Sequence, residues 1–301
     1  MSVAKRIWSD RHERLDELLE RAAPDARAAL EEGRVFVRGM RASSEAQLER
    51  GDVVEVWAAR ERGARQLGVL LDEGELVVVD KPAGLPSEPD HHGSWSVRSE
   101  LEAALFERTG RRVSVHLVSR LDAAVSGAMI VATNEAGRAR LTRAQAEGRL
   151  ERRYVAIAAG KLEGSGTWTG PVDEPTRPRG GRARRGDPRD AETRWVAVAH
   201  AGVRATLLAL EPITGRKHQL RAHAARAGAP LYGDRDRLGP TRLARADGRV
   251  IAVERILLHA SEVRLHEGEA SLRVRSPVDG SLLEVWSALD GDPGAWQSSE
   301  L

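Results

Sequence analysis

An arginine and an aspartate stand two positions apart between two apolar runs of the chain. The stretch reads VHLVSRLDAAVSGAMIVAT over residues 115–133, with Arg120 and Asp122 where the first run stops. Charged side chains are costly to bury unless they are paired or used in a reaction. A solvated hairpin turn, in which Asp is common, is the simpler interpretation of this stretch alone. The alternative is a functional carboxylate, and the rest of the sequence has to decide between the two.

The sequence lacks the motifs of several familiar catalytic sites. It has no G-x-x-x-x-G-K-[ST] loop and no G-x-S-x-G elbow, and GSGTWTG at 164–170 is one residue too long for G-x-G-x-x-G. His218 and His223 are five positions apart, so they do not share a helix face as H-E-x-x-H requires. The absence of cysteine removes thiolate zinc sites and cysteine nucleophiles. We therefore expect no ATP-dependent, dinucleotide-dependent, serine-hydrolase or metal chemistry.

Four segments, taken together, resemble one family. They are DKPAGLPSEP (80–89), SRLDAAVSG (119–127), ERRYVAIAAG (151–160) and PITGRKHQLRAHAARAGAPLYGD (212–234). In content and order they resemble the RluA-type pseudouridine synthases, whose members share R-L-D-x-x-x-S-G around a catalytic Asp. The fourth segment is the longest and most specific match, and LLHASEVRL at 257–265 also fits. The resemblance covers residues 13–288, nearly the whole chain.

The resemblance implies a reaction that needs one carboxylate and neither cofactor nor metal. Pseudouridine formation breaks the N1–C1′ bond of uridine, rotates the uracil and joins C5 to C1′. A glycosidase needs a second carboxylate to handle water, which an isomerase does not. By the resemblance Asp122 is the functional carboxylate, acting as a nucleophile toward the sugar or C6, or as a base.

Two further residues are assigned to the catalytic pocket by the same resemblance. Arg221 would pair with the catalytic Asp and balance its charge in a dry pocket. Tyr154 would pack against the target uracil and assist proton movement at C5. Without the resemblance, Arg221 would be interpreted as a surface helix residue and Tyr154 as a core residue of a strand.

Arg120 and Lys81 are expected near the RNA rather than in the reaction. A uridine inside a stem must be extruded, and in relatives the Arg of R-L-D enters the space it leaves. A phosphate contact or a structural ion pair is an equally good interpretation of Arg120. Lys81 is expected to support the RNA backbone. Ser119 stands where many relatives carry His, so we expect activity to survive but do not carry over the substrate choice of those relatives.

The segments indicate an α+β protein with a pseudouridine-synthase fold. We expect a mostly antiparallel mixed sheet with flanking helices, preceded by a small α+β module that resembles the S4 RNA-binding domain. Leu15, Leu18 and Leu19 at helical spacing, Pro24 opening a second helix, and two later strands define this module. The expected domains are 1–62, comprising the S4-like module and a linker, 63–290 for catalysis, and a frayed polar tail at 291–301.

RNA binding must be local, because 47 Lys and Arg against 45 Asp and Glu leave a net charge of only +2. The stretch RPRGGRARRGDPR at 177–189 holds six Arg, and the N-terminal module adds several more. A solvated, disordered stretch is the plain interpretation of the first, and phosphate tracking the functional one. The expected contacts are Arg27, Arg34, Arg38, Arg182, Arg184 and Arg185.

The leading hypothesis is an RNA pseudouridine synthase acting on ribosomal or transfer RNA. The alternatives are a catalytically silent RNA-binding homologue in ribosome assembly and a nucleoside glycosidase, which would need neither the module nor the Arg-rich stretch. Without a signal-like N-terminus or a long apolar run, we expect a cytoplasmic protein without a membrane partner. We also expect a monomer.

Overall fold

The computed structural model describes residues 3–23, 26–31, 35–37, 40–57, 67–89, 95–110, 113–172, 189–245, 248–268 and 270–297. The chain divides into two compact units, one of residues 1–66 with 89–94, the other of 67–88 with 95–301. The boundary predicted from the sequence lies at residue 62, and residues 89–94 were expected in the catalytic domain. Within the described ranges no helix is long and apolar enough to cross a membrane.

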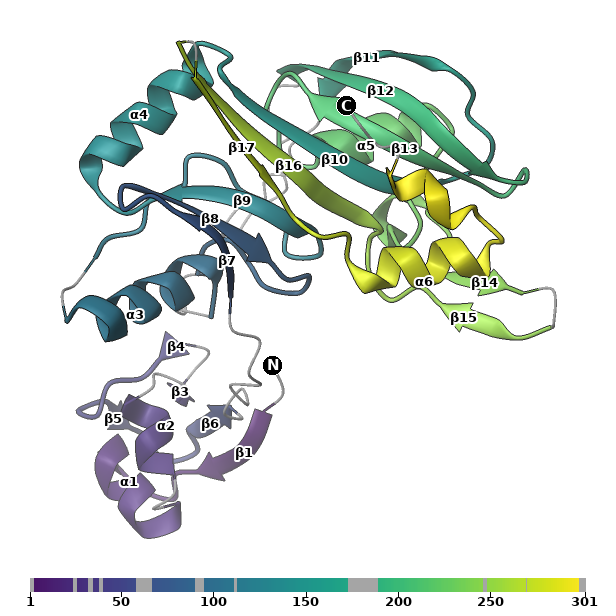
Figure 1. The fold of residues 1–301 in the computed structure, drawn as a ribbon. Helices are drawn as coiled ribbons and strands as arrows, with labels where there is room; N and C mark the ends of the chain where they lie inside the picture. The colour runs from purple at the N-terminus through teal and green to yellow at the C-terminus, as the bar shows by residue number, and fades with distance from the viewer. Residues whose placement is uncertain are drawn as a thin grey trace. The chain divides into compact units, whose positions relative to one another are not determined.

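The smaller unit joins two short helices to an antiparallel sheet in the order β1-β6-β3-β4, while β2 pairs with β5 (Figure 1). The predicted helical spacing of Leu15, Leu18 and Leu19 is confirmed, because all three are buried on α1. All buried residues of the core that they join belong to the segment from Ile7 to Val56, so this unit has a core of its own. The elements are β1 Val3–Trp8, β2 Glu13–Arg14, α1 Leu15–Ala22, α2 Arg27–Glu31, β3 Val35–Val37, β4 Met40–Arg41, β5 Gln47–Leu48 and β6 Val53–Trp57.

The larger unit is built on a nine-stranded mixed sheet, as predicted. Its order is β11-β12-β13-β10-β16-β9-β8-β7, with β17 also paired to β16. The β9–β16 pairing is parallel, and the other pairings in this sheet are antiparallel. Its strands are β7 Gly68–Asp72, β8 Leu76–Lys81, β9 Ser126–Ala132, β10 Leu150–Ala159, β11 Ser165–Val172, β12 Arg189–Ala201, β13 Ala205–Pro212, β16 Leu258–Glu267 and β17 Ala270–Arg275. A separate ribbon pairs β14 Arg242–Ala244 with β15 Val250–Ala252.

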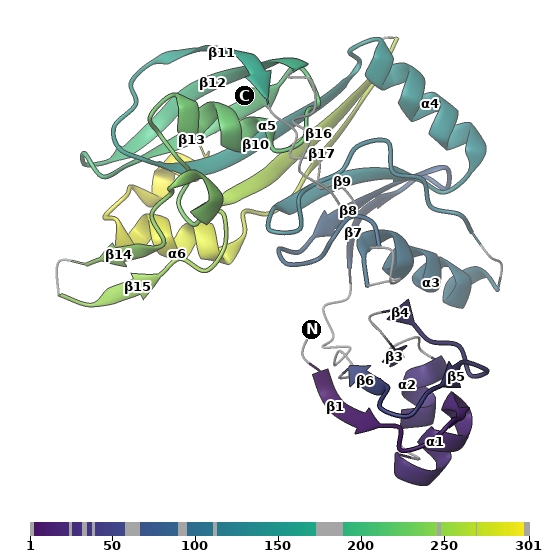
Figure 2. The same cartoon turned by 180° about the vertical axis from the view of Figure 1, so that it is seen from behind.

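Helices cover both faces of each half of this sheet (Figures 1 and 2). Helices α3 and α4 pack on opposite faces of the β8–β9 half, and α5 and α6 on opposite faces of the β10–β13 half. The helices are α3 Val97–Thr109, α4 Glu135–Ala146, α5 Gln219–Arg226 and α6 Gly280–Ala288, with short 3₁₀ turns η2 Arg235–Arg237 and η3 Pro293–Gln297. Helices α3 and α4 begin after the N-caps Ser96 and Asn134, whose side chains accept hydrogen bonds from the Ser99 and Gly137 amides.

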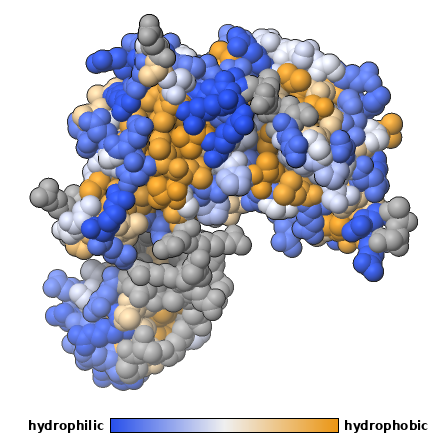
Figure 3. All heavy atoms as spheres, viewed as in Figure 1, coloured by the Kyte–Doolittle hydropathy of each residue, from blue (hydrophilic) through white to orange (hydrophobic). Residues whose placement is uncertain are grey.

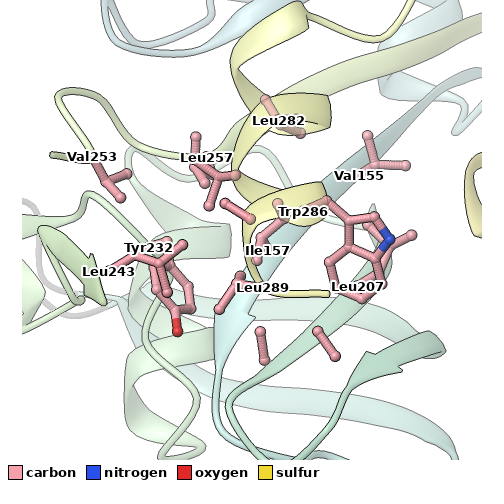
Figure 4. Close-up of a cluster of buried hydrophobic side chains, with 14 of the residues drawn as sticks. Val155, Ile157, Leu207, Tyr232, Leu243, Val253, Leu257, Leu282, Trp286 and Leu289 are labelled. Atoms are coloured by element: carbon pink, nitrogen blue, oxygen red, sulfur yellow. The ribbon is translucent and has the colours of Figure 1, made fainter. Parts of the chain in front are cut away.

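The core between α6 and strand β10 is built around Trp286 and Ile157 (Figure 4). Trp286 Nε1 donates to the carbonyl of Asp292 at 2.8 Å, and its ring meets Trp296 edge-on at 6.1 Å. The predicted polar tail from residue 291 is therefore wrong for 291–297, because Ala295 is buried and Trp296 packs on this core. A large aromatic ring offers enough apolar area to hold a short polar segment in place.

Strongly hydrophilic side chains gather over β16 and β17 on the face seen in Figure 3. Here Glu262 is buried, and it accepts hydrogen bonds from Arg273 at 2.6 Å and Arg275 at 2.8 Å. Burial alone would raise the pKa of Glu262, but these arginines lower it. The ion pairs fasten β17 to β16, the strand that also borders the site described next.

Candidate active site

Asp122 lies in the turn that leads into β9, and helix α5 supplies the groups beside its carboxylate. Arg221 Nη1 approaches Asp122 Oδ2 at 3.4 Å, and His218 Nε2 approaches Oδ1 at 3.5 Å. The Asp122 side chain is 27% exposed, so it is reachable from outside the unit. The two residues that the sequence predicts as a pair thus lie side by side, 99 positions apart in the chain.

Asp234, rather than Asp122, makes the closest contacts with Arg221. Arg221 Nε and Nη2 donate to the two Asp234 oxygens at 2.7 Å each, and Nη2 reaches Asp236 at 3.1 Å. The Asp234 side chain is 1% exposed and that of Arg221 is 6% exposed. Burial opposes the charged guanidinium, but the hydrogen bonds that it donates to Asp234 and Asp236, together with the charge of Asp122, raise the pKa of Arg221. Arg221 is therefore a fixed cation.

The turn before α5 is held by the buried amide of Gln219. Its Oε1 accepts from Thr214 Oγ1 at 2.7 Å and from the Arg216 amide at 3.0 Å, and its Nε2 donates to the Glu192 carbonyl at 2.8 Å. His218, the residue before the helix, has a left-handed backbone with φ of 57°. Residues with side chains rarely adopt this conformation, and it is often found at functional sites.

Tyr154 lies on β10 in the same apolar cluster as the residues flanking Asp122. Tyr154 is buried, and this cluster includes Val125 and, at its edge, Leu121. Burial raises the pKa of the Tyr154 hydroxyl, Asp122 adds to this rise, and Arg152 opposes it. The structure therefore brings the predicted Tyr154, Asp122 and Arg221 into one place.

Lys81 lies beneath the Asp122 turn and not at the surface. It is fully buried, and Nζ donates to the carbonyls of Pro82 at 3.0 Å, Leu85 at 2.7 Å and Ala123 at 3.1 Å. Burial, with Arg255, lowers its pKa to about 7, although Asp122 favours its charged form. The predicted support of the RNA backbone does not fit this position, because no part of Lys81 is exposed. The ammonium instead holds the backbone next to Asp122.

Gly127 of the R-L-D-x-x-x-S-G motif is required by the close approach of β9 to β16. Its φ is 115°, and a Cβ there would lie 2.2 Å from the Ala260 carbonyl oxygen. Ser126, the preceding residue, shares a hydrogen bond of 2.9 Å with His259 Nδ1. Arg255 donates to the Ala124 carbonyl at 3.4 Å and to Ser126 Oγ at 3.3 Å. The motif is thus tied to β16 through His259 and to the segment just before β16 through Arg255.

The residues expected to contact RNA lie in different surroundings. Arg120 is exposed and pairs with Glu88 at 3.0 Å. Arg27, on α2, pairs with the exposed Glu20 at 3.2 Å. The other expected contacts lie outside the described residues: Arg34, Arg38, Arg182, Arg184 and Arg185.

Sequence reasoning missed three residues of the site. His218 was weighed only as a zinc ligand, Asp234 was included in a motif without a role, and Ser87 was not considered. Ser87 Oγ donates to the Leu121 carbonyl at 2.7 Å, which fixes the backbone one residue before Asp122. The Asp at the end of APLYGD was the available signal for Asp234, because an aspartate inside an apolar Gly-Pro segment needs a partner.

Comparison with known proteins places this geometry in a family. The model of the family described as RNA pseudouridylate synthase matches residues 75–226, which include Asp122, Tyr154 and Arg221. The uncharacterized RNA pseudouridine synthase YhcT of Bacillus subtilis is 33% identical over 208 residues, 66% of this chain and 64% of that protein. Ribosomal large subunit pseudouridine synthase D of Xanthomonas campestris is 31% identical over 301 aligned positions, 93% of this chain and 89% of that protein.

A solved structure shares the fold. Human RNA pseudouridylate synthase domain containing 4 superposes with a TM-score of 0.59 at 23% identity, over 74% of this chain and 93% of that one. The family model covers half of the chain, and the Xanthomonas relative covers nearly all of it. The chain belongs to the RNA pseudouridylate synthase family.

Proposed function

We propose that this protein isomerises uridines in structured RNA to pseudouridine, with Asp122 as the carboxylate that acts on the target uridine. The observation that carries the proposal is the position of Asp122, which is partly exposed yet faces the buried cation Arg221 and lies beside the buried Tyr154. This arrangement places a partly exposed carboxylate beside a fixed cation, as a reaction at a sugar–base bond requires.

The neighbours of Asp122 suggest how the work is divided. The Arg221 guanidinium compensates the charge of Asp122 and is itself anchored by Asp234. Lys81 and Ser87 hold the backbone of the turn, so Asp122 keeps its position while the RNA enters. Tyr154 offers a flat apolar face for the uracil and a hydroxyl that can assist proton transfer at C5. Arg120, exposed beside the turn, would fill the space left by the extruded uridine.

The substrate in this proposal is ribosomal or transfer RNA, bound mainly through shape and phosphate contacts. The Xanthomonas relative is named for the ribosomal large subunit, which favours ribosomal RNA. We assign the N-terminal unit to RNA binding as an S4-like domain, and the Arg-rich stretch at 177–189 to phosphate contacts. The protein would act as a monomer in the cytoplasm, which light scattering and cell fractionation would test.

Pseudouridine mapping of total RNA from cells with and without the gene is the direct test. One or more uridines should be modified only when the gene is present, and adding it back with Asp122→Asn should not restore them. If no site depends on the gene while the purified protein binds RNA, the chain is an RNA-binding homologue without this activity. Release of free uracil would indicate a glycosidase instead.

A further inference from the structure

A polar pocket lies one side chain away from Asp122, between α5 and η2. It has a volume of about 370 Å³ and is lined by Ala222, Ala225, Arg226, Asp236, Arg237 and Leu238. Asp236 connects it to the active site, because Asp236 Oδ2 accepts from Arg221 Nη2 at 3.1 Å and Arg221 contacts Asp122. Its lining combines two alanines and Leu238 with three charged residues, Arg226, Asp236 and Arg237.

Two arginines in this pocket have positive charges that no carboxylate neutralises by a close contact in the described structure. Arg237 Nε is buried and lacks a hydrogen-bond partner among the described residues. Burial and the neighbouring Arg221 lower the pKa of Arg237, although Asp234 and Asp236 oppose this. Arg226 Nη2 donates to the Pro171 carbonyl at 2.6 Å, a neutral partner. A guanidinium without a carboxylate partner favours binding of an anion. Phosphate is especially suitable, because two of its oxygens can accept parallel hydrogen bonds from the planar guanidinium.

Leu238, which lines the pocket, combines an exposed apolar side chain with a left-handed backbone conformation. It is 90% exposed, and its backbone is left-handed with φ of 62°. The loop around it is fixed by backbone hydrogen bonds, from Gly233 to Pro240 at 2.7 Å and from Gly239 to Asp234 at 2.8 Å. A large apolar side chain held out in solvent on a fixed loop is suited to contact with a partner.

We propose that this pocket binds one phosphodiester group of the substrate RNA, close to the target uridine, through Arg237 and Arg226. Leu238 then covers the sugar or base of the adjoining nucleotide. This inference rests on the proposed function for its substrate. A phosphate held so near Asp122 would fix the register of the RNA strand, because phosphate contacts position a nucleic acid while the flipped base is read in its own pocket.

The pocket predicts changes of opposite sign from two neighbouring substitutions. Arg237→Gln removes the phosphate partner, so RNA affinity should fall about tenfold and the slope of log K against log salt should become shallower by about one. Asp236→Asn removes the one carboxylate facing the phosphate, so affinity should rise severalfold. Arg143→Gln, an exposed arginine on α4, is the matched control and should change neither. Binding is measured in an Asp122→Asn background, and thermal melting confirms that each variant is folded.

A phosphate-neutralisation scan identifies the contact itself. Methylphosphonate linkages are introduced singly around the target uridine of an RNA stem-loop taken from the mapped site. One linkage should cost the Arg237-containing protein about tenfold in affinity and should cost the Arg237→Gln protein clearly less, because only Arg226 still meets that phosphate. Equal costs in both proteins at every linkage, or an unchanged salt slope for Arg237→Gln, would overturn the proposal.

The test separates this inference from the proposed function. Salt dependence reports phosphate contacts whatever the RNA sequence, so the same variants are also compared on unfractionated transfer RNA. If the wild-type protein is inactive but the Arg237→Gln variant still binds RNA more weakly, the synthase function is contradicted and the phosphate site is supported. An active wild type with no loss in Arg237→Gln would contradict the phosphate site alone.

Discussion

Arg221 is shared by three carboxylates of unequal burial, and this sharing shapes the site. Asp234 is buried and bound through two short hydrogen bonds, Asp122 is partly exposed at 3.4 Å, and Asp236 is 84% exposed. The buried Asp234 therefore fixes the guanidinium, and the weaker contact leaves the Asp122 carboxylate available for another partner. A group that must act on a substrate cannot have all its hydrogen-bonding capacity used by the protein.

Asp122→Asn should abolish pseudouridine formation while RNA affinity stays within a few-fold of wild type. The amide keeps the shape of the side chain and removes the charge, and loss of one essential group typically costs on the order of a thousandfold in rate. Single-turnover conversion of the mapped RNA and a filter-binding titration measure the two quantities. Near-normal turnover would remove Asp122 from the mechanism.

Arg221→Met should destabilise the larger unit by roughly 3–5 kcal/mol, because Asp234 stays buried without a counter-charge. Activity should be lost as well, since Asp122 loses the same partner. Asp236→Asn is the control for stability, because it removes the exposed carboxylate on the same guanidinium and should cost less than about 1 kcal/mol. Urea titrations measure the free energy of unfolding of both variants. Equal stabilities would show that Arg221 does not hold Asp234 in place.

For single residues, the sequence predicts which residues form the site better than it predicts their burial and their contacts. Asp122, Tyr154 and Arg221 stand in recognisable motifs, and the structure groups them in the larger unit. The role of Lys81 could not be predicted, because burial depends on the strands and turns around it rather than on DKPAG itself. His218 was missed for a related reason, since only the fold brings its ring to Asp122.

The parallel junction of β9 and β16 lies directly after the turn that holds Asp122. Gly127 allows the two strands to approach, and Ser126 and His259 are hydrogen-bonded across them. Arg255 bonds to this junction and to Asp279, the N-cap of α6, at 2.7 Å. Arg255 therefore connects the start of α6 with the strand junction that follows the Asp122 turn.

His259 should make the unfolding free energy depend on pH. Burial lowers its pKa in the folded protein, whereas in the unfolded chain it titrates near 6.5. As the pH falls from 7 through 6.5, the unfolded state takes up a proton that the folded state resists, so stability is lost. His259→Gln removes this contribution. Its stability should fall less than that of wild type between pH 7 and 5 in urea titrations, and parallel curves would contradict the argument.

The whole chain consists of two units with separate cores, and the sequence indicates this division. The apolar spacing at 15–19 and the strand patterns at 34–57 lie within the smaller unit, and every buried residue of its core lies between Ile7 and Val56. Strand β1 was not predicted, because the charged residues of VAKRIW interrupt its apolar pattern. Its partner in the sheet is β6, about fifty positions later in the chain. Such long-range pairing is decided by tertiary contacts, which local pattern does not report.

Deletion of residues 1–66 should leave a folded catalytic unit with weakened RNA binding. The cores of the larger unit contain only residues from 67 onward, so its helices and sheet should persist. What is lost is a second binding surface on the same chain, and with it the gain from tethering two contacts to one RNA. We expect at least tenfold weaker binding and a shallower salt dependence, with little change in the rate at saturating RNA. Single-turnover kinetics against enzyme concentration at two salt levels measure all three. A truncated protein with full affinity but a reduced maximal rate would show that the N-terminal unit shapes the active site instead of binding RNA.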